Sequence, residues 1–455
     1  MGAKLLFVGD IHLGRRPGGL PTVVEEHGCR AADLGPAAAW RSTWEQAIAD
    51  RVDAVVLAGD VVESREDRIE AYSHLERGVR ALAAAGIAVY GVAGNHDGLV
   101  LPALADHLPE FRLLGRGGAW EQVACQAADG APYRLLGWSF PQQHVTANPL
   151  ATLPEELTGE GPLIGVLHAD VDGGSSPFAP VPRAELEAAP VAAWFLGHVH
   201  TPGELRAPRP VGSLGWLVGV DAGEPGPHGP WRVSLQADGR VVSEQLPLAP
   251  LRWERRELGL AGLDAAAGSV ADALSERLHR AFEELHQDLR PSLGSARAVA
   301  CRFTLVGATS AHRELADFVL SGRSRDFSRE FDGVRYFIEK LIDGTRPAVD
   351  LKKLAAGRDP VALLARRLQA LEEDGDEAEL LIQRARARFD AIADKALPWG
   401  CLDQEQRAPD PRALLLRAGR RALDELLAQR GEEPSAAAAA RDARQSAGAE
   451  PTREA

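Results

Sequence analysis

The stretch Leu5-Leu6-Phe7-Val8-Gly9-Asp10-Ile11-His12 joins a short apolar run to a glycine, an acid and an imidazole. Four consecutive apolar residues that end at a glycine have the length and the boundary of a buried β-strand. Apolar runs of similar length return at 54–58, 87–93, 163–167 and 191–196, and a polar motif follows each of them. This repetition predicts a buried sheet whose strands lead into polar loops.

Between the first three runs, apolar side chains recur at helical spacing. They are Trp40, Trp44, Ala47 and Ile48 in the first gap, and Tyr72, Leu75, Val79 and Leu82 in the second. Strands that alternate with helices indicate βαβ crossovers, so the first part of the chain is expected to be an α/β unit with parallel strands.

Downstream of residue 200 the pattern changes. Two strand-like runs at 231–235 and 241–246 flank an Asp-Gly pair and predict a β-hairpin. A helical segment near 270–287 and a strand at 298–306 predict a second, small α/β domain, and helical stripes follow from residue 361 and end near Pro398. Beyond Gly431 the chain has too few bulky apolar residues to form a core. The expected domains are 1–250, 251–345 and a helical segment 355–430, with a disordered tail at 431–455.

Five motifs hold the residues that can carry chemistry: Asp10-Ile11-His12, Gly59-Asp60, Gly94-Asn95-His96-Asp97, His168 and Gly197-His198-Val199-His200. Each comes at the carboxyl end of a predicted strand, and ligands of open α/β sheets gather outside those ends. The glycines are expected to let the chain turn sharply where it leaves a strand. Acids, an amide and imidazoles without a thiolate form a ligand set that suits manganese, iron or zinc.

Taken singly, each motif has an ordinary structural explanation. An Asp-x-His triplet occurs by chance in many chains, Gly-Asn-His-Asp is typical of a polar loop, and a histidine after an apolar run is typical of a core side chain. Five of the thirteen histidines nevertheless fall in these motifs, in order and each after a strand, so we predict a metal centre. The other histidines are expected to be surface or loop residues: His27, His74, His107, His144, His228, His279, His286 and His312.

The order of the five motifs resembles the signature of the calcineurin-like metallophosphoesterases. The segments Asp10–Gly14, Leu167–Gly173 and Trp194–Pro202 are similar to the DNA-repair nuclease branch, the SbcD family, and above all to YhaO-type proteins. The resemblance is strong over residues 1–205 and weaker through 251–254 and 303–315, which resemble the capping domain. It implies a four-layer α/β/β/α sandwich with a small α/β capping domain and a C-terminal helical segment.

The resemblance also implies a role for each motif residue. The implied ligand sets are Asp10, His12 and His200 for a first divalent ion, Asn95, His168 and His198 for a second, and Asp60 as the bridge. His96, beside the second ion, would protonate the leaving oxygen or stabilise the charge on the phosphorus, and Asp97 would orient the His96 ring. The implied metal is Mn²⁺. The implied partners are DNA, an SMC-like ATPase of the SbcC type on whose coiled coil the C-terminal helices would dock, and a second copy of the chain.

Composition limits the function classes. The 455-residue chain has a formal net charge of −14, which argues against a globally basic surface that holds nucleic acid, although bound cations or a partner could supply positive charge. The four cysteines lie far apart, which excludes a thiolate zinc site of the usual spacing and a disulfide scaffold and favours a reducing cytoplasm. No apolar run has membrane-spanning length, so no membrane contact is expected.

Three functions remain open. The favoured one is a DNA exonuclease or endonuclease subunit that acts in DNA end processing and repair with an SMC-like ATPase. A small-molecule phosphodiesterase or pyrophosphatase would use the same centre on a nucleotide and suits the acidic charge. A non-catalytic scaffold is disfavoured because every expected ligand position and His96 are filled. Arg15 and Arg16, directly after the first motif, could meet a phosphate backbone, and a solvated loop pair is an equally good interpretation.

Overall fold

The computed structural model describes residues 2–22, 24, 29–236, 238–261, 263, 269–373, 375–393 and 410–430. The expected disordered tail at 431–455 and the expected helix end at Pro398 lie outside the described residues. Two compact units cover the chain: 1–255, 282–302 and 325–339 form the first, and 256–281, 303–324 and 340–455 form the second. The expected domain boundaries stay predictions, because these units are interleaved in sequence.

The first sheet of unit 1 has the strand order β11-β10-β1-β2-β3-β4. Strands β1 to β4 are parallel, whereas β10 pairs antiparallel with β1 and with β11. The predicted hairpin is thus confirmed and forms one edge of this sheet. The strands are β1 (Lys4–Val8), β2 (Ala54–Ala58), β3 (Ala88–Val92), β4 (Phe111–Leu113), β10 (Trp231–Leu235) and β11 (Val241–Gln245).

The second sheet of unit 1 has the order β5-β6-β7-β8-β9, with β6 to β9 parallel and β5 antiparallel to β6. Sequence patterns predicted only β7 and β8 of these strands, because polar residues confine the apolar stretches of β5, β6 and β9 to four positions or fewer. The strands are β5 (Glu121–Gln126), β6 (Pro132–Trp138), β7 (Leu163–His168), β8 (Ala193–Gly197) and β9 (Val211–Ser213).

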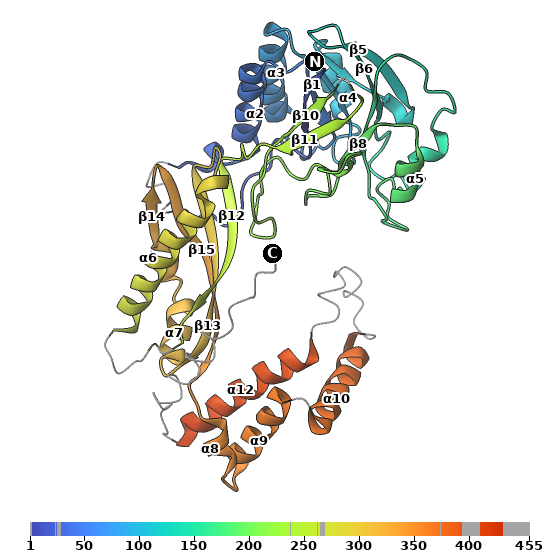
Figure 1. Cartoon of the computed structure of the whole chain (residues 1–455). Coiled ribbons are helices and arrows are strands. Elements are labelled where there is room, and N and C mark those ends of the chain that lie inside the picture. Colours follow the sequence, from blue (N-terminus) through green and yellow to red (C-terminus); the bar gives the residue numbers. More distant parts are fainter. Residues whose placement is uncertain are drawn as a thin grey trace. The chain divides into compact units, whose positions relative to one another are not determined.

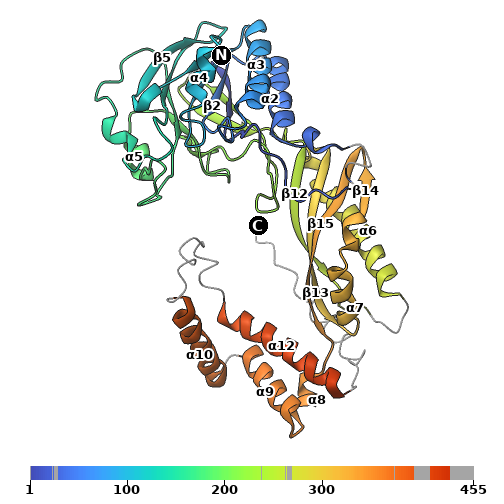
Figure 2. The ribbon, with the colours of Figure 1, turned by 180° about the vertical axis from the view of Figure 1, so that it is seen from behind.

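The two sheets pack face to face between helices. Leu6 and Val8 of β1 share a core with Trp40 of α2 (Pro36–Asp50) and Val79 of α3 (Arg68–Ala84). The alternate residue Phe7 faces the second sheet, where its ring stacks on Phe195 at a centroid distance of 4.2 Å. Figures 1 and 2 show α2 and α3 side by side. Further cover comes from α4 (Leu101–Asp106) on the first sheet and α5 (Arg183–Ala188) on the second. The predicted four-layer α/β/β/α sandwich is confirmed.

A third sheet follows the sandwich, with the order β12-β13-β15-β14. Its strands and the helices between them fall where a second α/β segment was predicted. They are β12 (Leu251–Gly259), α6 (Val270–Leu289), β13 (Ala298–Thr309), α7 (His312–Leu320), β14 (Ser328–Phe331) and β15 (Val334–Pro347).

The remaining helices belong to unit 2. Helix α9 (Pro360–Glu372) begins where Asp359 accepts a hydrogen bond from the Ala362 amide at 2.8 Å, and Pro360 occupies its first turn. Figures 1 and 2 show it beside α12 (Pro411–Arg430). Leu368 and Leu423, one from each helix, are buried in a shared apolar cluster. The others are α8 (Leu351–Ala355) and α10 (Asp376–Ala393), so the helical stripes predicted from residue 361 are confirmed within the described residues. None of the described helices is both long and apolar enough to cross a membrane.

Candidate metal centre

All five motifs lie at the carboxyl end of a strand of the sandwich. Asp10 and His12 come after β1, Asp60 after β2, and the Gly94–Asp97 motif after β3. His168 is the last residue of β7, and the Gly197–His200 motif begins at the end of β8. Because β1, β2 and β3 are parallel in one sheet and β7 and β8 in the other, their carboxyl ends meet at one edge of the sandwich.

The backbone is strained where it leaves these strands. Asp10, His12, Asp60 and His198 have φ angles of 29°, 51°, 47° and 89°, which residues other than glycine rarely adopt. Such strain persists only where the surrounding structure enforces it, and it concentrates at functional sites. Here the loops are tied together, since the His12 amide donates to the Asp60 carbonyl at 2.9 Å.

The motif glycines serve two different purposes. Gly59 has a φ of 90° and makes the expected turn, and a Cβ there would also lie 2.6 Å from His168 Nδ1. Gly94 and Gly197 instead leave room for a neighbouring side chain: a Cβ at Gly94 would lie 2.2 Å from Asp60 Oδ1, and one at Gly197 would lie 2.6 Å from His168 Nδ1. Close packing of the centre is therefore the reason for these two glycines, rather than the predicted sharp turn.

The first predicted ligand set converges. Asp10, His12 and His200 each offer one ligand atom within 4.8 Å of the others. His12 Nε2 lies 4.0 Å from Asp10 Oδ1 and 3.8 Å from Asp60 Oδ2. Asp10 also accepts a hydrogen bond from the His198 amide at 3.0 Å, which fixes the orientation of its carboxylate.

The second predicted set converges beside the first. Asn95 Oδ1 lies 2.9 Å from His168 Nε2 and 3.2 Å from His198 Nδ1. His168 Nε2 lies 3.3 Å from Asp60 Oδ2, the same oxygen that His12 faces. Asp60 thus stands between the two sets, in the position that a bridging carboxylate requires.

These donors fit divalent cations. The His12 side chain is 1% exposed, and its Nε2 has no hydrogen-bond partner among the described residues. A buried polar atom without a partner is costly, and a cation in front of it would satisfy it. Carboxylate, amide oxygen and imidazole are ligands that manganese, iron and zinc accept.

The buried charges of the centre also act on one another. Burial opposes the charge on His168, but the nearby Asp60 and Asp10 carboxylates outweigh it and raise the pKa of His168 to about 9. Burial likewise opposes the charge on Asp60, and His168 holds the pKa of Asp60 well below its usual range. Asp10 is fully buried, which raises its pKa. Because ligands must be deprotonated to bind, a cation would displace the proton of His168.

Asp97 and His96 have contacts that differ from those expected for an imidazole and the carboxylate that orients it. Asp97 is buried and accepts hydrogen bonds from the amides of Val61 and Gly94 at 2.6 and 2.7 Å, so it braces two motif loops. The His96 ring is held by another group, since its Nδ1 lies 2.9 Å from the Glu63 carbonyl. His96 is exposed and groups with His12 and Asp60, on the side of the first predicted ion rather than the second.

Four further residues lie at the centre, and of these the sequence pointed only to Arg15, as a possible phosphate contact. Glu63 Oε2 lies 2.6 Å from His12 Nδ1, and Glu224 Oε1 lies 3.3 Å from His200 Nδ1. Trp216 stacks on the His12 ring at 4.4 Å, and Arg15 lies over the Trp216 ring. Glu63 could have been found as an acid three residues after Asp60 in the same loop. Glu224 and Trp216 carry no such signal, because they reach the site from distant segments.

Three histidines that were expected at the surface or in loops are buried. Both ring nitrogens of two of them have partners, the Trp216 and Glu224 carbonyls for His228 and Tyr336 and Asp332 for His286. His312 Nε2 lies 2.7 Å from Asp424 Oδ1, whereas its Nδ1 has no hydrogen-bond partner among the described residues. They lie outside the predicted ligand sets. His27 lies outside the described residues.

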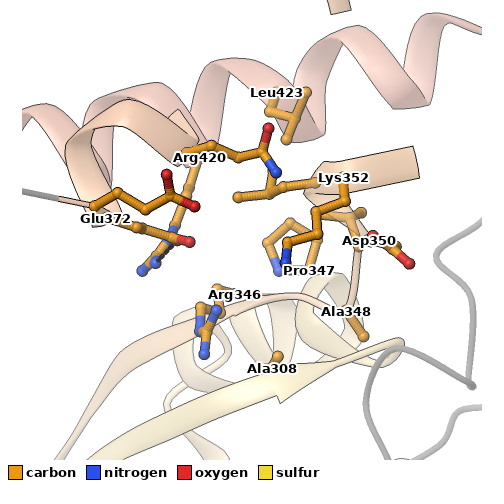
Figure 3. A pocket seen from close by; sticks show the side chains of 13 residues that line it. Ala308, Arg346, Pro347, Ala348, Asp350, Lys352, Glu372, Arg420 and Leu423 are labelled. Carbon is orange, nitrogen blue, oxygen red and sulfur yellow. Dashed lines mark hydrogen bonds and ion pairs between the residues drawn. The ribbon is translucent and has the colours of Figure 1, made fainter. Parts of the chain in front are cut away.

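Unit 2 contains a cavity of its own. It has a volume of about 300 Å³ and lies between the end of β15 and the helices α8, α9 and α12 (Figure 3). Arg346, Lys352 and Arg420 line it together with acidic residues, and Arg420 pairs with Glu372 at 2.6 Å. The lining includes no imidazole or thiol. Its basic and acidic side chains offset one another in charge.

The sequence profile of the calcineurin-like phosphoesterases matches residues 3–202. Similar proteins include the uncharacterised metallophosphoesterase YhaO of Bacillus subtilis, 24% identical over 251 residues, which are 54% of this chain and 60% of that protein. They also include the DNA double-strand break repair protein Mre11 of Aeropyrum pernix, 28% identical over 299 residues, which are 61% of this chain and 68% of that protein. The chain thus spans less than two thirds of the length of YhaO.

Two solved structures align with the chain at low similarity. A dimetal phosphatase from Danio rerio aligns with a TM-score of 0.34 and 13% identity, over 53% of this chain and 98% of that one. The protein TT1561 of Thermus thermophilus aligns with a TM-score of 0.31 and 11% identity, over 54% of this chain and 99% of that one.

Proposed function

Residues 3–202 form a calcineurin-like phosphoesterase domain, and from this premise we propose that the protein is a two-metal phosphodiesterase that cleaves DNA. The observation that carries the proposal is the convergence of two ligand sets on one oxygen of Asp60, which lies 3.8 Å from His12 Nε2 and 3.3 Å from His168 Nε2. A shared carboxylate between two sets of this kind is suited to a pair of ions.

The ligands proposed for the pair keep the assignments expected from the sequence. They are Asp10, His12 and His200 for one ion, Asn95, His168 and His198 for the other, and Asp60 for both. Bound there, two divalent cations would offset the negative charge of a phosphodiester and increase the acidity of a nearby water molecule. Manganese, iron and zinc all accept this ligand set, and Mn²⁺ is proposed among them on the resemblance to the metallophosphoesterases.

The chain itself supplies the proton for the leaving oxygen. The Glu63 carbonyl accepts the proton of His96 Nδ1 and so leaves Nε2 of the exposed ring to face a substrate. A protonated His96 Nε2 can donate to the leaving oxygen, which avoids expelling an alkoxide and is typically worth about 10²- to 10⁴-fold in rate.

DNA is proposed as the substrate on the similarity to Mre11, whose name assigns it to DNA double-strand break repair. The test is incubation of the purified chain with Mn²⁺ and either linear DNA or bis-p-nitrophenyl phosphate. Cleavage of DNA that is lost on chelation would support the proposal. Cleavage of the small ester alone would favour a nucleotide phosphodiesterase instead, as the net charge of −14 would suit. Inertness on both would indicate a scaffold.

We further propose an SMC-like ATPase as the partner, docked on the C-terminal helices, with the active complex built on a homodimer. The support in unit 2 is an exposed apolar side chain on each of two successive helices, since Leu363 and Leu380 are each 48% exposed. A coiled-coil fragment of such an ATPase should be retained by the immobilised chain and released by Leu363→Asp combined with Leu380→Asp. Retention by the double variant would contradict this docking, and sedimentation of the chain alone tests the homodimer.

A further inference from the structure

Glu63 contacts three groups of the centre at once. It lies in the loop after β2, three residues beyond Asp60. Its Oε2 is 2.6 Å from His12 Nδ1, and its Oε1 is 3.5 Å from Arg15 Nη1. Its main-chain carbonyl is 2.9 Å from His96 Nδ1. One residue therefore touches a predicted metal ligand, the predicted proton donor and a cation.

Trp216 closes these contacts into a circuit. The His12 ring stacks on the Trp216 ring with 4.4 Å between centroids and 22° between planes. The Arg15 guanidinium carbon lies 4.8 Å from the centroid of the same indole, within the range of a cation–π contact. The contacts therefore form a closed ring: Glu63 contacts His12, His12 contacts Trp216, Trp216 contacts Arg15, and Arg15 contacts Glu63.

The carboxylate of Glu63 determines which nitrogen His12 presents. With Nδ1 held by Glu63, the proton of the ring stays on that side and Nε2 faces the Asp10 and Asp60 oxygens. A carboxylate on the far nitrogen also makes the imidazole a stronger ligand, and removal of such a partner typically lowers metal affinity about 10- to 100-fold.

The same carboxylate holds Arg15 at the rim of the centre. The Arg15 side chain is 35% exposed, so it is accessible to a ligand while Glu63 and Trp216 limit its movement. A guanidinium presents a rigid fork of donors that matches phosphate oxygens. Arg16, its neighbour in sequence, is more exposed than Arg15. The structure therefore distinguishes Arg15 from Arg16 as a candidate phosphate contact, which the sequence alone did not do.

We propose that Glu63 is a positioning residue for both sides of the centre: it orients the His12 ring toward the first metal ion and the Arg15 guanidinium toward a substrate phosphate oxygen. The proposal rests on the proposed phosphodiesterase function. The effect of Glu63 on metal affinity can nevertheless be measured without any substrate.

The effect of Glu63 on metal affinity is tested by calorimetric titration of metal-free protein with Mn²⁺. Glu63→Ala should weaken the binding of one of two ions by about 10- to 100-fold, because His12 loses its partner. Glu63→Gln should stay within a few fold of wild type, since the amide oxygen can still accept from Nδ1. Glu66→Gln, which removes an exposed charge from the same loop, is the matched control and should bind both ions normally.

The contact of Arg15 with a substrate phosphate is tested by the Michaelis constant for bis-p-nitrophenyl phosphate at saturating Mn²⁺. Arg15→Ala should raise KM by roughly 10- to 100-fold with normal metal binding, as expected for a lost charged hydrogen bond. Glu63→Gln should raise KM in the same direction, because its amide cannot form an ion pair with Arg15. Arg16→Ala is the control and should leave KM unchanged.

The outcomes separate this inference from the proposed function. Unchanged Mn²⁺ affinity in Glu63→Ala would overturn the orientation of His12, and an unchanged KM in Arg15→Ala would overturn the contact with phosphate. A wild-type protein that binds no Mn²⁺ would overturn the proposed function as well. Equal losses of Mn²⁺ affinity in Glu63→Ala and Glu63→Gln would show that the charge of Glu63 matters rather than its hydrogen bond, and would also overturn the proposal.

Discussion

At the scale of single residues, five of the seven proposed ligands are buried, whereas the ligand His200 and the proposed proton donor are exposed. Asp10, His12, Asp60 and His168 are each at most 2% exposed, whereas His96 is open to solvent. Burial protects the proposed ions from competition with water, and exposure lets a substrate reach the His96 ring. The two kinds of residue should therefore respond differently to substitution.

His96→Ala is expected to lower kcat by about 100-fold or more while the Mn²⁺ content stays near that of wild type, since His96 is proposed to move a proton and not to hold an ion. Steady-state kinetics and elemental analysis of the same sample check this. His96→Ala protein that had lost its metal would instead make this side chain a ligand, as its closeness to His12 and Asp60 would allow.

At the scale of elements, the centre depends on how closely the strand ends approach one another. The end of β8 passes so near β2 and β7 that a Cβ at Gly197 would lie 2.1 Å from the Ala58 carbonyl and 2.6 Å from His168 Nδ1. No side chain fits there without moving a ligand. The positions of the ligands therefore depend partly on the lack of a Cβ atom at Gly197.

Gly197→Ala is expected to destabilise the protein by about 1–3 kcal/mol through overpacking and to weaken Mn²⁺ binding by displacing His168. Denaturant unfolding and metal titration measure the two effects. Gly259→Ala, where a Cβ would meet no atom within 4 Å, is the control and should be close to neutral. If Gly197→Ala were as stable as wild type and bound Mn²⁺ as tightly, β8 would be able to move away from β2 and β7 at little cost.

In unit 2, a polar cluster joins α7 to α12. Asp424 accepts from His312 Nε2 at 2.7 Å and from Arg313 Nη2 at 2.9 Å. Asp424→Ala should cost about 1–3 kcal/mol, because His312 is buried and loses its partner. Unfolding in denaturant measures the cost, with Glu425→Ala, whose carboxylate is 65% exposed, as the control. Equal stabilities of the two variants would contradict this role for the cluster.

At the scale of the whole molecule, unit 1 gathers buried carboxylates whose charge a cation would balance. Asp10 and Asp60 both present an oxygen to His12 Nε2, at 4.0 and 3.8 Å, and both belong to groups that could hold an ion. Binding of the ions should therefore stabilise the folded state, by an amount that grows with the metal concentration relative to its Kd.

Chelation should lower the melting temperature, and Mn²⁺ at about 100 times its Kd should raise it by roughly 5 °C or more, since such occupancy is worth about 2.7 kcal/mol. Differential scanning calorimetry checks the shift. Asp60→Ala, which removes the shared oxygen, should be insensitive to Mn²⁺. If neither the chelator nor Mn²⁺ changed the melting temperature of the wild type, this would contradict a metal centre.

By itself, the sequence determined that the first part of the chain is an α/β unit with parallel strands and that five motifs end those strands. Both follow from local patterns, because apolar runs, helical spacing and the polar residues after them are recognised within a few neighbouring positions. The likeness to the metallophosphoesterases then supplied the expected ligand sets. The patterns missed β5 and β6, whose burial depends on the sheet that they join rather than on their own composition.

Only the tertiary structure decided what surrounds the ligands. Glu224 and Trp216 reach His200 and His12 from segments that carry no motif, Asp97 braces loops instead of orienting His96, and Gly94 and Gly197 are small because another segment lies against them. These are contacts between residues far apart in the chain. Their formation depends on the packing of whole strands and loops, which no local pattern encodes.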